Sequence, residues 1–330
     1  MLPAPAQLNR VRALWIVPLL LLFGGCSREK SVASALTPGE FRLAVPGGTI
    51  WYKVTGTGSG TPVVLLHGGP GFSSFYLKPL EALGDDRSVI RYDQLGGGKS
   101  DPISDPTLFT IPHFVEELDS LRSHLGIERW HVLGHSWGTI LAFEYYRAHP
   151  ERVVSLTFGS PVFDIPAYER RARELLATLP DSLRRAVVRS EALGAYDSPE
   201  YQNAINAFYA LYVFRHPVKA DLDSTFATMN QAIYGYMQGP SEFTITGTLK
   251  DYVVTDSLVT VKVPTLLTVG EFDEVGPELV RGFAARIPGA RFEQLAGAAH
   301  ITSWDAPDAM IAAVRTFLRS ADSVAVKASQ

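Results

Sequence analysis

Cysteine is nearly absent from this sequence, which excludes a disulfide framework. Cys26 is the only cysteine among 330 residues, so no intramolecular disulfide can form. An excess of basic charge is also lacking: 30 lysines and arginines against 34 aspartates and glutamates give a net charge of −4, which argues against nucleic-acid binding. The chain contains neither H-E-x-x-H nor C-x-x-C, and its histidines and aspartates form no metal-like cluster, so we expect no metal ion and no other cofactor.

The N-terminus has the pattern of a signal peptide. Its apolar run at residues 13–23 is about 11 residues long, short of the roughly 20 that a membrane-spanning helix needs. The run follows Arg10 and Arg12 and precedes two glycines, which is the order of charged, apolar and small residues found in export signals. We therefore predict that residues 1–25 are a signal peptide.

Cys26 follows these glycines directly and resembles the lipidated cysteine of bacterial lipoproteins. The resemblance implies cleavage before Cys26, attachment of a diacylglyceryl group, and an exported protein that is anchored to a membrane and faces the periplasm or the cell exterior. Residues 26–38 are small and polar, which is typical of a flexible tether. Ordinary secretory cleavage and an uncleaved N-terminal anchor are the alternatives.

Beyond the tether, short apolar runs alternate with helical periodicity. Such alternation predicts an α/β fold with a mainly parallel sheet flanked by helices. The first two strands are expected to form a hairpin around Pro46-Gly47-Gly48. The expected strands are 41–45, 49–54, 63–66, 88–92, 130–133, 153–158, 265–269 and 291–295, and the expected helices are 114–125, 139–147, 278–286 and 306–320.

The alternation stops between residues 161 and 244. This stretch shows helical patterns at 168–179, 182–193 and 201–214 and no convincing strand before Phe243-Thr244-Ile245. An all-helical insertion between the sixth and seventh strands predicts a lid over the carboxyl ends of the strands, where ligands bind in such sheets. The core is then expected at 39–160 and 245–320, with a C-terminal tail at 321–330.

Gly134-His135-Ser136-Trp137-Gly138 fits the pattern G-x-S-x-G between a predicted strand and a predicted helix. In that setting the glycines permit a sharp turn that lifts the serine hydroxyl above the sheet, so Ser136 is predicted to be a nucleophile. The alternative is a small-residue turn chosen only for close packing. His135 is expected to point away from the hydroxyl of its neighbour.

A serine nucleophile needs a base, and the base needs a third group that orients it. In this architecture the chain order is nucleophile, acid, histidine. His300, after the last predicted strand, is the expected base, and Asp273, after the seventh strand, is the expected acid. Asp164, after the sixth strand, is the alternative acid.

His67-Gly68-Gly69-Pro70-Gly71 follows a predicted strand, and consecutive glycines there let backbone N–H groups approach a developing oxyanion. Gly69 and Trp137 are the expected donors. A phosphate-binding loop is the alternative, which the missing G-K-[ST] motif disfavours. Gly98-Lys99-Ser100 does carry that ending, but it runs into Asp101-Pro102 and offers no helix N-terminus for a phosphate.

Four motifs, in this order, resemble those of the proline iminopeptidase family of α/β-hydrolases. The likeness runs from about Phe41 to Phe317 and is nearest to the tricorn-interacting aminopeptidase branch, which shares Glu242–Gly247. Leu95 and Thr139 depart from the family's pattern, which bears on the size of the pocket. The four motifs are His67–Gly71, Asp93-Gln94 with the glycines after it, Gly134–Gly138 and Gly270–Glu274.

The resemblance implies an α/β-hydrolase fold and an exopeptidase that holds the free α-amine of its substrate with carboxylates. Glu242 and Glu274 match those positions, and Tyr234 matches a position that lines the site. An ammonium group in a partly desolvated pocket requires hydrogen-bonded negative charge, which agrees with two acids. A solvated loop acid is the alternative for Glu274, and a lid-closing salt bridge is the alternative for Glu242.

Together with this resemblance, the motifs predict a serine aminopeptidase. It would release an N-terminal proline or another apolar residue from short peptides or amino-acid amides, through an acyl-enzyme on Ser136. An esterase or lactonase acting on small non-peptide substrates is the alternative on the same scaffold. A lipoprotein that binds peptides without turnover is the alternative from another class, and the complete set of nucleophile, base and acid argues against it.

Overall fold

The computed structural model describes residues 1–4 and 36–328, with side chains described as far as Val324. The chain divides into two units, Met1–Ser34 and Ala35–Gln330, and the second contains the sheet and its helices. The predicted signal run, Cys26 and most of the predicted tether lie outside the described residues. Within the described ranges, no helix combines the length and the apolar character that crossing a membrane requires.

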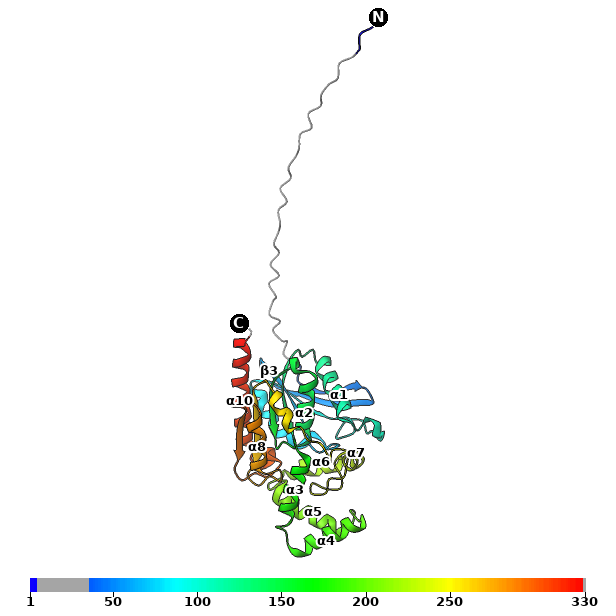
Figure 1. Cartoon of the computed structure of the whole chain (residues 1–330), viewed down its shortest axis with the longest axis vertical. Coiled ribbons are helices and arrows are strands. Elements are labelled where there is room, and N and C mark those ends of the chain that lie inside the picture. The colour runs from blue at the N-terminus through cyan, green and yellow to red at the C-terminus, as the bar shows by residue number, and fades with distance from the viewer. Residues whose placement is uncertain (5–35, 329–330) are drawn as a thin grey trace. The chain divides into compact units, whose positions relative to one another are not determined.

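The sheet is seen among its helices in Figure 1. Its eight strands have the order β1-β2-β4-β3-β5-β6-β7-β8. The hairpin partners β1 and β2 pair antiparallel, as do β2 and β4, while every other neighbouring pair is parallel. The predicted hairpin and the mainly parallel sheet are therefore confirmed. The strands are β1 Gly39–Val45, β2 Gly48–Thr55, β3 Gly60–Leu66, β4 Arg87–Asp93, β5 Trp130–His135, β6 Val153–Gly159, β7 Thr265–Gly270 and β8 Arg291–Leu295.

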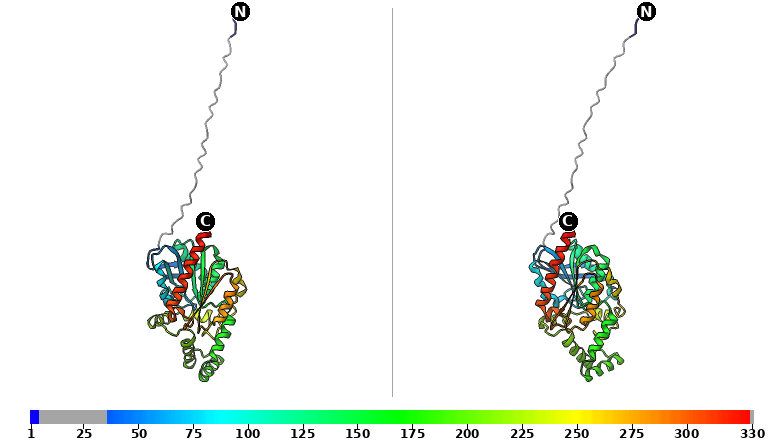
Figure 2. Two further views of the ribbon diagram at one scale, coloured as in Figure 1. Left: turned by 90° about the vertical axis from the view of Figure 1, so that its left-hand side faces the viewer. Right: turned by 60° about the vertical axis from the view of Figure 1, so that its left-hand side comes forward.

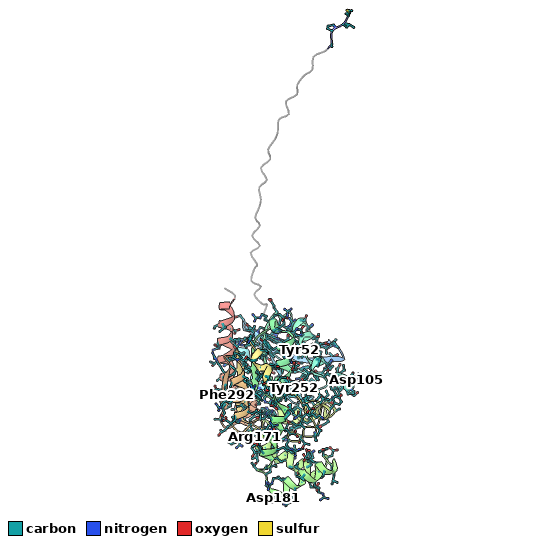
Figure 3. All side chains as sticks on the ribbon, viewed as in Figure 1. Tyr52, Asp105, Arg171, Asp181, Tyr252 and Phe292 are labelled. Carbon is teal, nitrogen blue, oxygen red and sulfur yellow. The ribbon has the colours of Figure 1, made fainter. Side chains whose placement is uncertain are left out.

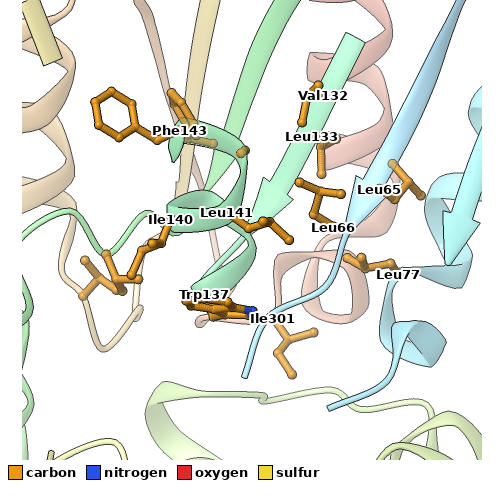
Figure 4. Packing of buried hydrophobic residues seen from close by; sticks show 14 of the residues in the cluster. Leu65, Leu66, Leu77, Val132, Leu133, Trp137, Ile140, Leu141, Phe143 and Ile301 are labelled. Carbon is orange, nitrogen blue, oxygen red and sulfur yellow. The ribbon is translucent and has the colours of Figure 1, made fainter. Parts of the chain in front are cut away.

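Helices cover both faces of the sheet. Helices α1 and α2 pack together and α2 lies on β5, whereas α10 and the 3-10 segment η1 pack together and α10 also contacts β6 and β3. Figure 4 shows α2 in front of the strands and α10 behind them. These elements are η1 Ser74–Asp85, η2 Pro106–Leu108, α1 Ile111–His124, α2 Trp137–Ala148, η3 Pro150–Arg152, η4 Thr255–Thr260, α8 Pro277–Arg286, α9 Thr302–Asp305 and α10 Pro307–Ala328.

The core between α2 and the central strands is a rigid base for the turn after β5. Leu66 and Leu133 of the strands and Leu141 of α2 are fully buried, and their side chains converge in Figure 4. Burying one such side chain contributes about 1.5–3 kcal/mol relative to leaving it exposed. The strand-to-helix turn after β5 is therefore held from both sides by close packing.

The last helix corrects the predicted C-terminal tail. We expected a helix at 306–320 followed by a tail at 321–330, but α10 continues to Ala328 and lies along the sheet (Figure 2). Asp322 explains the extension, because it accepts a hydrogen bond from buried His131 at 3.0 Å and forms an ion pair with buried Arg87 at 3.1 Å. These partners are far away in the sequence, so local periodicity does not reveal them.

Five helices occupy the predicted lid between β6 and β7. The sequence pattern predicts three of these helices. It does not predict α6 and α7, which are short. The expected strand at Phe243–Ile245 is wrong: only an isolated bridge joins Ser241 to Thr244, and the Phe243 ring packs against Tyr201 of α5 at 5.9 Å. Asp181, at the start of α4, lies at the end of the lid that is remote from the sheet (Figure 3). The lid helices are α3 Ile165–Leu176, α4 Asp181–Leu193, α5 Pro199–Tyr212, α6 Lys219–Ala227 and α7 Gln231–Met237.

Candidate active site

Ser136 occupies a strained turn between β5 and α2. Its backbone angles are φ 54° and ψ −124°, a conformation that costs a non-glycine residue about 1–3 kcal/mol. The flanking glycines are required by close approach: a Cβ on Gly134 would lie 2.0 Å from the Gly138 oxygen, and one on Gly138 would lie 2.2 Å from the Leu66 oxygen. The side chain of Ser136 therefore stands at the carboxyl end of the sheet, in the geometry expected of a nucleophile elbow.

His300 and Asp273 meet beside this turn. The His300 Nδ1 lies 2.9 Å from Asp273 Oδ1, which also accepts a hydrogen bond from the Val275 N–H at 2.9 Å. Burial opposes ionisation of Asp273, but the charge and hydrogen bond of His300, with the hydrogen bond from the Val275 N–H, hold the pKa of Asp273 below its ordinary value. Burial likewise opposes protonation of His300, yet Asp273 raises its pKa above the ordinary value.

The Nε2 atom of His300 faces an acid. It lies 3.7 Å from Glu274 Oε1, and no hydrogen bond within the described ranges joins it to Ser136 Oγ. Hydrogen bonds between a nucleophile and its base commonly tighten only when substrate binds. The structure therefore brings together the predicted acid and base and places Glu274 on the reactive nitrogen of the base.

Asp164, the alternative acid, has another role. Its carboxylate accepts a hydrogen bond from the Ala167 N–H at 2.8 Å and caps the N-terminus of α3. A carboxylate at this position satisfies a helix N–H group that has no intrahelical partner. Asp164 is therefore a helix cap at the start of the lid.

His135 and Ser160 hold the backbone of the base. The His300 carbonyl accepts hydrogen bonds from His135 Nε2 at 2.8 Å and from Ser160 Oγ at 3.1 Å. Burial, with the nearby His300 charge, lowers the pKa of His135 to about 3, so its ring is neutral. Its Nδ1 then accepts from the Tyr76 hydroxyl at 3.0 Å. His135 points away from the Ser136 hydroxyl, as expected, and positions His300.

Glu274 and Glu242 have contrasting environments. Glu242 accepts hydrogen bonds from the hydroxyls of Tyr168 at 2.7 Å and Tyr234 at 2.8 Å, and from the Gln238 amide at 3.1 Å. Glu274 is 0% exposed, and neither of its carboxyl oxygens has a hydrogen-bond partner among the described residues. Burial, together with the charges of Glu242 and Asp273, raises the pKa of Glu274 well above its ordinary value.

Sequence patterns did not reveal two of the three donors to Glu242. Tyr168 lies on α3 and Gln238 follows α7, and both face Glu242 across stretches of the chain that show only helical periodicity. The resemblance to the family pointed to Tyr234, and the structure places its hydroxyl on Glu242. One acid of the pair is thus fully hydrogen-bonded and the other is not.

The predicted oxyanion donors share a cavity with the nucleophile. Gly69, Trp137 and Ser136 line a small cavity together with Glu242, and its free volume of about 10 Å³ has room for roughly one water molecule. Trp137 begins α2, and N–H groups of the first helical turn have no acceptor within the helix. A larger hollow of about 1110 Å³ opens on the lid among α3, α4 and α5, and its lining contains none of the predicted site residues.

The two departures from the family pattern lie outside this cavity. Leu95 is fully buried and packs toward Gly47 and Gly48 in the β1–β2 turn. Thr139 is also fully buried, and its hydroxyl donates to the Ser136 carbonyl at 2.6 Å. Neither side chain lines the cavity at Ser136, so neither sets its size.

Comparisons with known proteins identify the family of this chain. A family model described as alpha/beta hydrolase fold matches residues 61–307. A proline iminopeptidase of Heyndrickxia coagulans is 39% identical over 281 residues, which cover 84% of this chain and 98% of that protein. Another, of Saccharolobus solfataricus, is 36% identical and covers 82% of this chain and 89% of its own length.

Solved structures show the same likeness. The crystal structure of a proline iminopeptidase from Mycobacterium smegmatis has a TM-score of 0.79 at 34% identity, covering 87% of this chain and 100% of that chain. A thermophilic esterase from Thermogutta terrifontis has a TM-score of 0.63 at 23% identity, covering 86% of this chain and 99% of its own, a likeness that shows the fold alone.

Proposed function

This chain belongs to the proline iminopeptidase family of α/β-hydrolases, and from that premise we propose that it is a serine aminopeptidase releasing an N-terminal proline or another apolar residue from short peptides or amino-acid amides. The observation that carries the proposal is Glu274: a fully buried carboxyl group without a hydrogen-bond partner among the described residues, 3.7 Å from the reactive nitrogen of His300. A substrate ammonium group is the natural partner for such a group.

The positions of Ser136, His300 and Asp273 support the following hydrolytic steps. Ser136 Oγ attacks the carbonyl carbon of the N-terminal residue while His300 Nε2 accepts the hydroxyl proton, and Asp273 holds the imidazole through Nδ1. The N–H groups of Gly69 and Trp137 stabilise the oxyanion of the tetrahedral intermediate. His300 then donates its proton to the departing amine, and a water molecule hydrolyses the acyl-enzyme by the same steps in reverse.

Selection for a free α-amine follows from the two acids. Glu242 is held by three donors, and Glu274 has none in the part of the chain that the structure describes. An ammonium group beside them gains charge-assisted hydrogen bonds. An N-acetylated substrate leaves a buried carboxyl group unpaired, which costs about 1–3 kcal/mol or more.

Substrate entry requires movement of the lid. The cavity at Ser136 has about 10 Å³ of free volume, which is far less than an amino-acid residue occupies. Tyr168 of α3 and Tyr234 of α7 line this cavity from the lid side. We infer that these two helices shift to admit the substrate and then return Glu242 to the ammonium group.

Esterase or lactonase activity on the same scaffold would use Ser136 and His300 but not Glu242 and Glu274. Hydrolysis of prolyl, alanyl and leucyl arylamides, of their N-acetyl forms, and of a simple ester separates the two functions. We expect free-amine arylamides to be cleaved and their N-acetyl forms to react at least about 10-fold more slowly in kcat/KM. Equal rates on both forms contradict the proposal, and cleavage of the ester alone favours the esterase. The Ser136→Ala variant is the control and should lack all of these activities.

We also propose, from the sequence pattern, that the protein is exported and anchored to a membrane through a lipid on Cys26. Expression in bacteria with labelled palmitate tests this. The natural chain should incorporate label and sediment with membranes, and Cys26→Ser should do neither. An unlabelled, freely soluble natural chain contradicts the proposal.

A further inference from the structure

The Asp93–Ser100 segment after β4 has no role in the proposed hydrolytic steps. Its glycines fold the chain around the Asp93 carboxylate, which accepts hydrogen bonds from the Ser74 N–H at 2.7 Å and from the Lys99 N–H at 2.8 Å. Gly98 has φ 58°, and a Cβ there would lie 2.2 Å from Asp93 Oδ2. The turn is therefore occupied by its own carboxylate, which excludes a phosphate, and it fixes the position of the residue after Asp93.

That residue is Gln94, which is 1% exposed and bonds to both loops that carry the expected oxyanion donors. Its amide Nε2 donates to the His67 carbonyl at 3.0 Å, and its Oε1 accepts from the Trp137 indole N–H at 2.8 Å. Its backbone N–H donates to His67 Nε2 at 3.0 Å. His67 leads into Gly69, so one side chain connects the two donor segments.

The partners of Gln94 are themselves fixed. Because His67 Nε2 accepts a hydrogen bond, the neutral ring carries its proton on Nδ1, which lies 2.9 Å from the Gly68 carbonyl. Burial lowers the pKa of His67 and keeps the ring neutral. The next residue, Leu95, donates its N–H to buried Glu117 on α1 at 3.0 Å. The amide of Gln94 therefore has little freedom to move.

We propose that Gln94 is a positioning residue for the oxyanion hole: its amide group sets the spacing between the backbone N–H groups of Gly69 and Trp137. The inference rests on the proposed acyl transfer at Ser136. Its physical basis is geometric, since oxyanion donors act only when they lie about 2.7–3.1 Å from the developing charge. Donors that can drift apart bind the ground-state carbonyl almost as well but stabilise the transition state less.

The test is Gln94→Met, which keeps the length of the side chain and removes both amide hydrogen bonds. With a prolyl arylamide we expect kcat to fall about 10- to 100-fold and KM to change by less than about 3-fold. The affinity for a boronic-acid analogue of proline, which forms a tetrahedral adduct with the serine, should fall by the same factor as kcat/KM. Gln202→Met on α5 is the matched control and should retain normal activity. It removes an exposed hydrogen bond from the Gln202 amide to the Tyr196 carbonyl, and Gln202 does not line the cavity at Ser136.

Trp137→Phe provides an independent test, because it removes the indole N–H and keeps the backbone N–H. We expect a similar loss of kcat, and the double variant should lose little more than either single variant, since both remove one connection. The ratio of kcat for Gln94→Glu to kcat for Gln94→Met should rise as the pH falls, because a protonated carboxyl group restores both a donor and an acceptor. The common titration of His300 cancels in that ratio.

An unchanged kcat, or an unchanged boronate affinity, in a folded Gln94→Met variant overturns the inference. A higher KM at constant kcat also overturns it, since that pattern indicates lost ground-state binding. If the natural enzyme cleaves esters but no arylamide, the aminopeptidase proposal fails, and the role of Gln94 is then measured by the same kcat and KM comparison on the ester.

Discussion

Replacing Glu274 by glutamine separates the amine-binding role proposed for this residue from its effect on stability. The carboxyl group is fully buried and has no hydrogen-bond partner among the described residues, so the folded protein gains nothing from it there. Under the proposed function, the substrate ammonium group gains a charge-assisted hydrogen bond from it, worth about 1.5–3 kcal/mol. Glu274→Gln should therefore lower kcat/KM for a free-amine substrate by about 10- to 150-fold.

The same variant should be as stable as the natural chain or more so, and the difference should depend on pH. Burial raises the pKa of Glu274 in the folded state well above its ordinary value of 4.5. The stability that protonated Glu274 contributes to the natural chain is fully present below that ordinary pKa. It is lost as the pH rises through the pKa of Glu274 in the folded state. The melting temperature of Glu274→Gln minus that of the natural chain should therefore increase as the pH rises above about 4.5.

Two measurements check this reasoning: kcat/KM on prolyl and N-acetylprolyl arylamides, and calorimetric melting temperatures between about pH 4.5 and pH 8. Glu278→Gln is the matched control, because Glu278 lies on α8 with its side chain 88% exposed. Unchanged discrimination between free and acetylated substrates would refute the amine-binding role. A variant less stable than the natural chain across this range would show that the folded protein does pair the carboxyl group.

Three further predictions concern the base, the lid and the last helix. Asp273 raises the pKa of His300, so kcat/KM should fall in acid with a midpoint above the ordinary pKa of 6.5. In pH–rate profiles, Asp273→Asn should lower that midpoint and reduce kcat by up to about 10⁴-fold. Tyr168→Phe removes a 2.7 Å hydrogen bond to Glu242 and should raise KM for free-amine substrates about 10-fold with little change in kcat; equal effects on acetylated substrates would contradict an amine-binding role for Glu242. Asp322→Ala leaves buried His131 and Arg87 without this partner and should lower the free energy of unfolding by about 2 kcal/mol while kcat stays unchanged, as measured by denaturant unfolding.

Some of this protein could be predicted from short stretches because the physical constraint is itself local. The hairpin β1–β2 follows from a glycine turn between two strand patterns, and the turn at Ser136 follows from glycines at the two positions where a Cβ would collide with backbone oxygens. The chain order of Ser136, Asp273 and His300 is the one typical of this architecture, and each residue follows a strand of the parallel part of the sheet.

Other features escaped prediction because they depend on partners that are distant in the sequence. Helices α6 and α7 are short and owe their positions to the lid as a whole. The segment Phe243–Ile245 looks like a strand by composition, but its aromatic ring is buried against the lid. The extension of α10 depends on a buried arginine and a buried histidine in two different strands.

The sequence by itself determined the α/β architecture and predicted a nucleophile, a base and an acid, because glycine spacing, apolar periodicity and chain order are local properties. The two further acids, Glu242 and Glu274, were predicted only through the resemblance to the family. Only the tertiary structure decided that Glu242 is surrounded by donors while Glu274 has none among the described residues, and that Gln94 bonds to both His67 and Trp137. Hydrogen bonding and desolvation depend on which groups folding brings within about 3 Å of one another, and that distance is set by the packing of the whole chain.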